Sequence, residues 1–131
     1  MTVLPITLSA AAVAALVNFW LATRIAQVRT DQNIWVGDGG NELLTRRMRA
    51  QINFAENTPL ILILVAGIEL AGRGGLWLAI LAGVYLLGRV LHGIGMDGGK
   101  WGKGRMIGMM VNMLTFAILT VTALLLVARV A

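Results

Sequence analysis

The amino-acid sequence predicts an all-α fold, an integral membrane four-helix bundle. Of the 131 residues, 58% are hydrophobic and only 13% are charged, whereas about 25% of the residues of an average soluble protein are charged. The apolar residues are gathered into four blocks, each near the roughly 20 residues that a helix needs to cross a bilayer core. Four such spans leave only short loops, so residues 1–131 are expected to form a single domain.

The first block extends from Val3 to Thr23 and is interrupted by Asn18, which is expected to hydrogen-bond to another helix. No basic residue precedes the block, whereas Arg24 and Arg29 follow it. A secretory signal carries its basic residues in front of the apolar segment. We therefore expect a retained helix that has its N-terminus outside and its basic end inside.

The second block has a fully apolar part, Leu60–Ala71, that is too short to span a membrane by itself. A helix from about Asn41 to Ala71 would be about 46 Å long, so its first turns are expected to project beyond a hydrocarbon core of about 30 Å. Asn41 follows a glycine-rich turn and is the predicted N-cap. Glu69 and Arg73, four residues apart at the far end, are expected to form a local ion pair.

The third block, Leu76–Gly88, is short but extends through Arg89 to about Met96, and the fourth runs from Met106 to Val127. Two pairs of small residues spaced four apart, Gly104 with Gly108 and Ala79 with Gly83, are predicted to allow close approach between helices.

The eleven basic residues are distributed unevenly between the two ends of the predicted spans. Only two, Arg73 and Arg129, lie at one end. The other nine flank the first and third loops: Arg24, Arg29, Arg46, Arg47, Arg49, Arg89, Lys100, Lys103 and Arg105. The positive-inside rule then places loops one and three in the cytoplasm and both termini outside. Membrane orientation and attraction to anionic lipid also account for the net charge of +5, so no nucleic-acid partner is expected.

Polar side chains form a stripe on the second predicted helix. Arg49, Asn53, Glu56 and Asn57 share one face because they are spaced i, i+4, i+7 and i+8, and Gln51 lies on another face. An arginine, an amide and a carboxylate on one stripe suit a ligand that carries both carboxylate and amino groups. The alternative is internal pairing, in which Arg49 or Arg46 binds Glu56 and holds the bundle together.

A second polar stripe, Arg89, His92 and Met96, lies on the third helix and is predicted to converge with the first at the cytoplasmic end. With a single histidine and no cysteine, the chain is not expected to hold a metal ion. Arg105, near the start of the fourth helix, can face the bundle. An arginine aimed at a thiolate would lower the pKa of that thiol.

The stretch from Arg49 to Pro59, Arg-Ala-Gln-Ile-Asn-Phe-Ala-Glu-Asn-Thr-Pro, resembles the MAPEG family, the membrane-associated proteins in eicosanoid and glutathione metabolism. That family includes microsomal glutathione transferases and leukotriene and prostaglandin synthases. The resemblance covers nearly the whole chain, through its length, its four spans, the over-long second helix and the Arg89-x-x-His92 step with a following glycine. Within the family, the chain resembles a bacterial-type member similar to the microsomal glutathione transferases.

The resemblance implies a homotrimer that binds glutathione as co-substrate between subunits and takes a lipophilic substrate from membrane lipid. It implies that Arg49 holds a glutathione carboxylate, that Asn53 and Glu56 bind its polar backbone and amino group, and that Gln51 and Arg29 reach in from the adjacent subunit. Arg105 would stabilise the thiolate, or Lys103 if no residue is inserted. Arg105 is favoured because a guanidinium cannot lose its charge. Asn57, Arg89 and His92 complete the candidate binding residues.

The leading hypothesis is a glutathione-dependent transferase or peroxidase that acts on lipophilic electrophiles, with Arg105 as the catalytic residue. The alternative is a non-catalytic binding or interaction protein on the same scaffold. It is motivated by Asn57, His92 and Met96, which stand where members with transferase activity commonly carry tyrosines. A small multidrug exporter would need a carboxylate in the first span, and that span has only Asn18.

Overall fold

Four long helices make up most of the computed structural model, which describes residues 3–130 and contains no strand in that range. The helices are α1 (Pro5–Gln32), α2 (Glu42–Ile68), α3 (Leu76–Met96) and α4 (Lys103–Val130). All four are long and apolar enough to cross a membrane, so the predicted all-α membrane bundle is confirmed.

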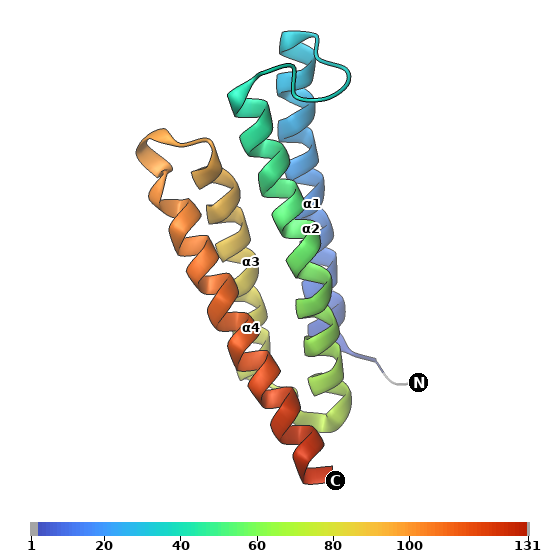
Figure 1. Ribbon diagram of the computed structural model, residues 1–131. Coiled ribbons are helices and arrows are strands. Elements are labelled where there is room, and N and C mark those ends of the chain that lie inside the picture. The colour runs from blue at the N-terminus through green and yellow to red at the C-terminus, as the bar shows by residue number, and fades with distance from the viewer. Residues whose placement is uncertain (1–2, 131) are drawn as a thin grey trace.

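The helices run up and down as two hairpins, α1 with α2 and α3 with α4 (Figure 1). The two longer connections, residues 33–41 and 97–102, lie together at one end, here called the loop end. The start of α1, the end of α4 and the short α2–α3 connection lie at the opposite end, here called the terminal end. This arrangement is the one that an even number of antiparallel spans requires.

The helix ends differ from the predicted spans where polar residues extend the helices. The first helix continues from Thr23 to Gln32 and stops where Asn33 adopts a left-handed conformation. The fourth helix begins at Lys103, before the predicted Met106. Hydropathy detects the part of a helix that suits hydrocarbon, whereas backbone hydrogen bonding continues into the more polar flanks.

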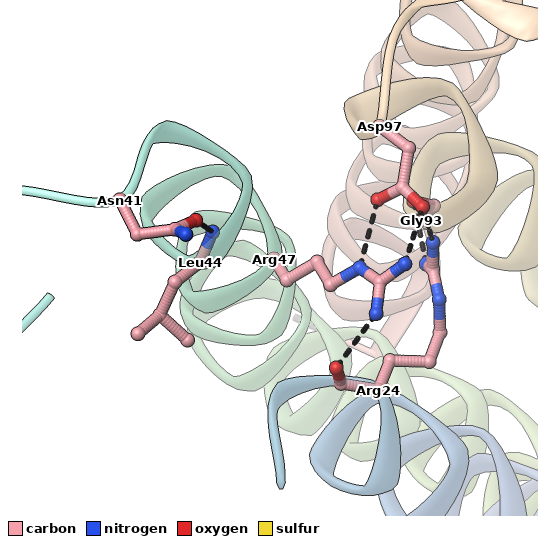
Figure 2. A network of polar contacts seen from close by, with 6 residues as sticks. All are labelled: Arg24, Asn41, Leu44, Arg47, Gly93 and Asp97. Carbon is pink, nitrogen blue, oxygen red and sulfur yellow. Dashed lines mark hydrogen bonds and ion pairs between the residues drawn. The ribbon is translucent and has the colours of Figure 1, made fainter. Parts of the chain in front are cut away.

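The start of α2 agrees with the sequence prediction, because the side chain of Asn41 accepts a hydrogen bond from the backbone N–H of Leu44 at 2.9 Å (Figure 2). Its far end also lies close to the predicted Ala71. The α-helix ends at Ile68, and a π-helical turn, Glu69–Arg73, follows in which Gly72 has a positive φ of 69°.

The expected ion pair between Glu69 and Arg73 is wrong. Glu69 instead accepts hydrogen bonds from the backbone N–H groups of Ile6 and Thr7, at 2.9 and 2.8 Å, and from the Thr7 hydroxyl at 2.7 Å. Pro5 stands at the first position of α1 and has no N–H to satisfy. A carboxylate at a helix N-terminus meets both free donors and the positive end of the helix dipole, which explains why Glu69 pairs there.

The main apolar core joins all four helices through the middle of the bundle. Its fully buried members include Leu21, Ile61, Leu78 and Leu119. A second, smaller apolar cluster lies toward the loop end and contains only residues of the first hairpin and its loop: Ile25, Val28 and Leu44 with the partly buried Ile34 and Met48. This smaller cluster therefore does not join the two hairpins, whereas the main core extends toward the loop end as far as the partly buried Met96 of α3.

Glycines bring α3 and α4 into close contact, as the Gly104–Gly108 spacing predicts. A Cβ atom on Gly104 would lie 2.7 Å from the carbonyl oxygen of Leu91, and one on Gly108 would lie 2.5 Å from that of Gly88. The Ala79–Gly83 spacing has no such role within the described chain, because a Cβ atom on Gly83 would meet nothing within 4 Å.

Candidate functional site

A polar cavity of about 600 Å³ lies between α2, α3 and α4 near the loop end. Both polar stripes predicted from the sequence contribute to its lining, and so does the start of α4: Arg49, Asn53 and Glu56 from α2, His92 and Met96 from α3, and Arg105 from α4. The helical spacing of each stripe turns these side chains to one side of their helix. The predicted convergence of the two stripes is thus present in the fold.

Of the four charged side chains on the α2 wall of the cavity, two pair with each other and two form no ion pair within residues 3–130. Arg46 pairs with Glu42, one turn earlier on the same helix. Among the ion pairs formed within residues 3–130, none involves Arg49 or Glu56. Internal pairing with Glu56, the alternative explanation of the stripe, therefore does not describe this part of the chain.

Arg89 lies behind the cavity wall and orients one of its members. Its side chain is 1% exposed, and its Nη1 group donates to Oδ1 of Asn53 at 2.7 Å. Because a guanidinium can only donate, the oxygen of the Asn53 amide must face Arg89. The amide nitrogen of Asn53 is left to donate to another group. Among the described residues, Nε and Nη2 of Arg89 have no hydrogen-bond acceptor.

Asn57 shares the helix face of the stripe but does not line the cavity. Its Nδ2 group donates to the backbone oxygen of Asn53 at 2.7 Å, and its Oδ1 accepts from Asn112 of α4 at 3.2 Å. In this chain Asn57 therefore links α2 to α4 inside the bundle.

Gln51 and Arg29 lie away from the cavity of their own chain. Gln51 donates to Oδ1 of Asn18 on α1 at 3.4 Å. Arg29 donates to the backbone oxygens of Ile34 and Gly37, at 3.2 and 2.9 Å, and so holds the first loop. The structure does not bring either residue together with Arg49 and Glu56.

The start of α4 places Arg105 at the cavity and leaves Lys103 outside its lining. The reason is the close packing of α4 on α3, because a Cβ atom on Gly95 would lie 2.1 Å from the backbone nitrogen of Arg105. Only a glycine at position 95 permits this approach. Arg105 and Arg46 also line a smaller extension of about 190 Å³ under the α3–α4 loop.

A second polar cluster at the loop end consists of Arg24, Arg47 and Asp97, here called the Asp97 cluster (Figure 2). Arg47 donates from Nε and Nη2 to the two carboxylate oxygens of Asp97, at 3.1 and 2.9 Å. Arg24 donates to the same carboxylate and to the carbonyl oxygen of Gly93, the latter at 2.7 Å, and its guanidinium lies over the ring of Trp20. The cluster thereby joins α1, α2 and the end of α3.

Electrostatics keep the Asp97 carboxylate ionised. Partial burial raises the pKa of Asp97, but hydrogen bonds and charge from Arg47 and Arg24 outweigh this effect, so the pKa lies below its ordinary value. Sequence analysis did not single out this cluster. The available signal was one acidic residue at the end of a helix, between regions rich in arginine and lysine.

Within residues 3–130, no group of three His, Asp or Glu side chains is arranged to hold a metal ion. In comparisons with known proteins, a sequence model of the MAPEG family matches residues 7–125, which include every residue of the cavity lining described above. No curated protein matches the chain.

Proposed function

Because the chain belongs to the MAPEG family, we propose that it is a glutathione-dependent transferase or peroxidase acting on lipophilic electrophiles at the membrane. The observation that carries this proposal is the polar cavity of about 600 Å³. It combines arginines with a carboxylate and an amide in a bundle whose outer surface is otherwise rich in exposed apolar side chains.

The groups that line the cavity match the chemistry of glutathione, which carries two carboxylates, an amino group and a thiol. Arg49 can bind a carboxylate through a bidentate pair of hydrogen bonds, and Asn53 can donate to a carboxylate or a peptide carbonyl. Glu56 can accept from the amino group. The chain has no cysteine, so the reacting sulfur must come from the ligand.

Arg105 is the residue that we assign to the reacting sulfur. Its positive charge favours the thiolate over the thiol and releases the proton to water. The thiolate then attacks an electrophilic carbon, forming a carbon–sulfur bond as the leaving group departs. With a peroxide, it attacks oxygen as the O–O bond breaks. The rate comes from charge stabilisation and from holding both reactants together.

We also propose the homotrimer, with Gln51 and Arg29 serving the cavity of a neighbouring subunit. Their distance from the cavity of their own chain supports this assignment. The lipophilic substrate would arrive from the bilayer, and the cavity would face the cytoplasm because nine of the eleven basic residues flank the loop end.

Isothermal titration of glutathione into detergent-solubilised, oligomeric protein tests the binding step. We expect saturable binding, and an affinity at least about tenfold lower for Arg49→Gln, since a charged hydrogen-bonded pair contributes about 1.5–3 kcal/mol. Arg73→Gln is the matched control, because Arg73 lies at the terminal end of the same span. A parent protein that remains oligomeric and shows no saturable binding would contradict the proposal.

Conjugation of glutathione to chlorodinitrobenzene tests the chemical step. Arg105→Ala is expected to lower kcat by about 100-fold or more, the usual effect of removing one group that stabilises a developing anion. Lys103→Ala, which removes a neighbouring charge outside the cavity lining, is expected to stay near the parent rate. Equal losses in both variants would point to a general charge effect and contradict the assignment of Arg105.

A second candidate function is binding without turnover. It is favoured by the environment of Tyr85, the one tyrosine of the chain, which is 1% exposed and shares a hydrogen bond of 2.9 Å with Thr58. Tyr85 is therefore not presented to the cavity. Saturable glutathione binding by the parent without conjugation or peroxidase activity would favour this candidate.

A further inference from the structure

The Asp97 cluster lies directly behind two walls of the polar cavity. On α2, Arg46 and Arg49 line the cavity, whereas Arg47, between them in sequence, belongs to the cluster. On α3, Met96 lines the cavity and Asp97 is the next residue. A rotation of about 100° per residue sends neighbouring helical positions to different sides. Each wall thus has a cavity face and, one residue away, a contact with the cluster.

Several hydrogen bonds and partial burial constrain the geometry of the Asp97 cluster. Both oxygens of Asp97 are bonded, and the side chains of Arg24, Arg47 and Asp97 are only 12%, 16% and 28% exposed. Arg47 also donates to the backbone oxygen of Arg24 at 2.8 Å. A planar guanidinium that binds both carboxylate oxygens fixes direction as well as distance.

At this end of the molecule the main apolar core reaches the second hairpin through the partly buried Met96, and the smaller apolar cluster does not reach it. The small cluster of Ile25, Val28 and Leu44 packs α1 against α2 and has no buried member from the second hairpin. The second hairpin is itself tightly joined, because Gly95 and Gly104 bring α3 and α4 into backbone contact. A change in the position of α3 at Asp97 is therefore expected to move α4 and Arg105 with it.

We propose that Asp97 is a positioning residue, whose ion pairs with Arg47 and Arg24 set the separation between the α2 wall and the α3–α4 wall of the cavity. This separation determines whether Arg49 on one wall and Arg105 on the other engage one ligand together. The choice of glutathione as that ligand rests on the proposed function, whereas the effect on wall separation does not.

Glutathione titration compares Asp97→Asn with two further variants. The amide keeps the size of the side chain but cannot accept charge-assisted bonds at both positions, and we expect binding at least about tenfold weaker. Asp97→Glu, which restores the carboxylate, is expected to recover most of the affinity. Asp38→Asn, the same change in the other loop of this end, is expected to bind like the parent.

Distances between spin labels give a readout that needs no ligand. Because the chain has no cysteine, a doubly substituted chain with Leu43→Cys and Lys100→Cys carries one spin label at each introduced cysteine. Both positions are exposed, and they lie on different hairpins. Labelled protein is diluted with unlabelled protein so that only distances within one chain are measured. Asp97→Asn is expected to shift and broaden the distance distribution, and Asp38→Asn to leave it unchanged.

An unchanged distance distribution in Asp97→Asn would overturn the proposal, and so would a shifted distribution with parent affinity. If Asp97→Asn does not fold, Arg47→Lys replaces it, because lysine keeps the charge but loses the two-pronged contact. A parent protein that binds no glutathione contradicts only the proposed function, since the label distances still decide the role of Asp97.

Discussion

Asn53 receives a hydrogen bond from the buried Arg89, and this contact decides what its amide can offer to a ligand. The carbonyl oxygen faces Arg89, so the amide nitrogen is the group that Asn53 has free to donate to a ligand. From sequence, Arg89 and Asn53 were both assigned to ligand binding. In the structure only Asn53 lines the cavity, whereas the buried Arg89 lies behind the wall and donates to Asn53.

Substitutions at Asn53 are expected to separate folding from binding. Asn53→Asp gives Arg89 an ionic partner and should preserve thermal stability, but it replaces a donor by an anion and should lower glutathione affinity at least about tenfold. Asn53→Ala removes the acceptor of a buried guanidinium and should lower the free energy of unfolding by about 1–3 kcal/mol. Thermal unfolding and titration calorimetry measure the two effects. Parent-like affinity in Asn53→Asp would contradict the donor role.

The lowered pKa of Asp97 predicts a defined pH dependence of stability. Because the folded-state pKa lies below the unfolded value of about 3.9, the carboxylate stabilises the fold above that value. This stabilisation is lost as the pH falls through the folded-state pKa. The difference in melting temperature between parent and Asp97→Asn should be constant above about pH 5 and shrink below about pH 4.

The difference between these two proteins is the informative quantity, because other carboxylates titrate in the same range. The pKa of Asp38 is also lowered, by hydrogen bonds from the backbone of Gly40 and the hydroxyl of Thr45. If the difference in melting temperature between the parent and Asp97→Asn stays the same down to the lowest pH, the ionised form of Asp97 does not stabilise the fold.

At the scale of the helices, hydropathy predicted the number of spans, and the glycine-rich turn with the Asn41 cap predicted the start of α2, because both signals are local in sequence. The ion pair at the terminal end of α2 was mispredicted for a physical reason. Spacing along one helix suggested Arg73 as the partner of Glu69, whereas the free N–H groups at the start of α1 are stronger partners brought there by the fold. Likewise, helical spacing predicted that Asn57 would face the cavity with the rest of its stripe. In the structure Asn57 bonds to Asn112 on α4 and does not line the cavity.

The contact between α3 and α4 depends on glycine at position 108. A Cβ atom there would lie 2.5 Å from the backbone oxygen of Gly88 and from Cβ of His92. Gly108→Ala is expected to lower the free energy of unfolding by about 1–3 kcal/mol through overpacking. Gly83→Ala, in open space on α3, should be neutral or slightly stabilising. Thermal unfolding in detergent compares them, and equal stability of the two variants would contradict this account.

For the whole molecule, the folded chain brings most of its basic residues to the loop end, as the order of spans and loops predicted. The cavity, the Asp97 cluster and the glycine contact around Arg105 all lie near this end. The sequence could indicate the two polar stripes because each follows one helix. It could not indicate the Asp97 cluster, because Arg24, Arg47 and Asp97 belong to three different elements.

Sidedness follows from this charge distribution and can be measured in cells. We expect the loop end to face the cytoplasm. A membrane-impermeant maleimide should label Leu76→Cys, at the terminal end, in intact cells, and should label Gln32→Cys, at the loop end, only after permeabilisation. Both positions are exposed, and the chain has no cysteine of its own. The reverse labelling pattern would invert the proposed orientation.

The carboxylate that completes the first turn of α1 comes from Glu69, 63 positions later in the chain than Ile6. Without the second helix, the backbone amides of Ile6 and Thr7 would lack this carboxylate partner. Their desolvation in lipid is costly without a partner. We therefore expect the first helical hairpin, and not α1 alone, to be the smallest unit in which these two amides are paired.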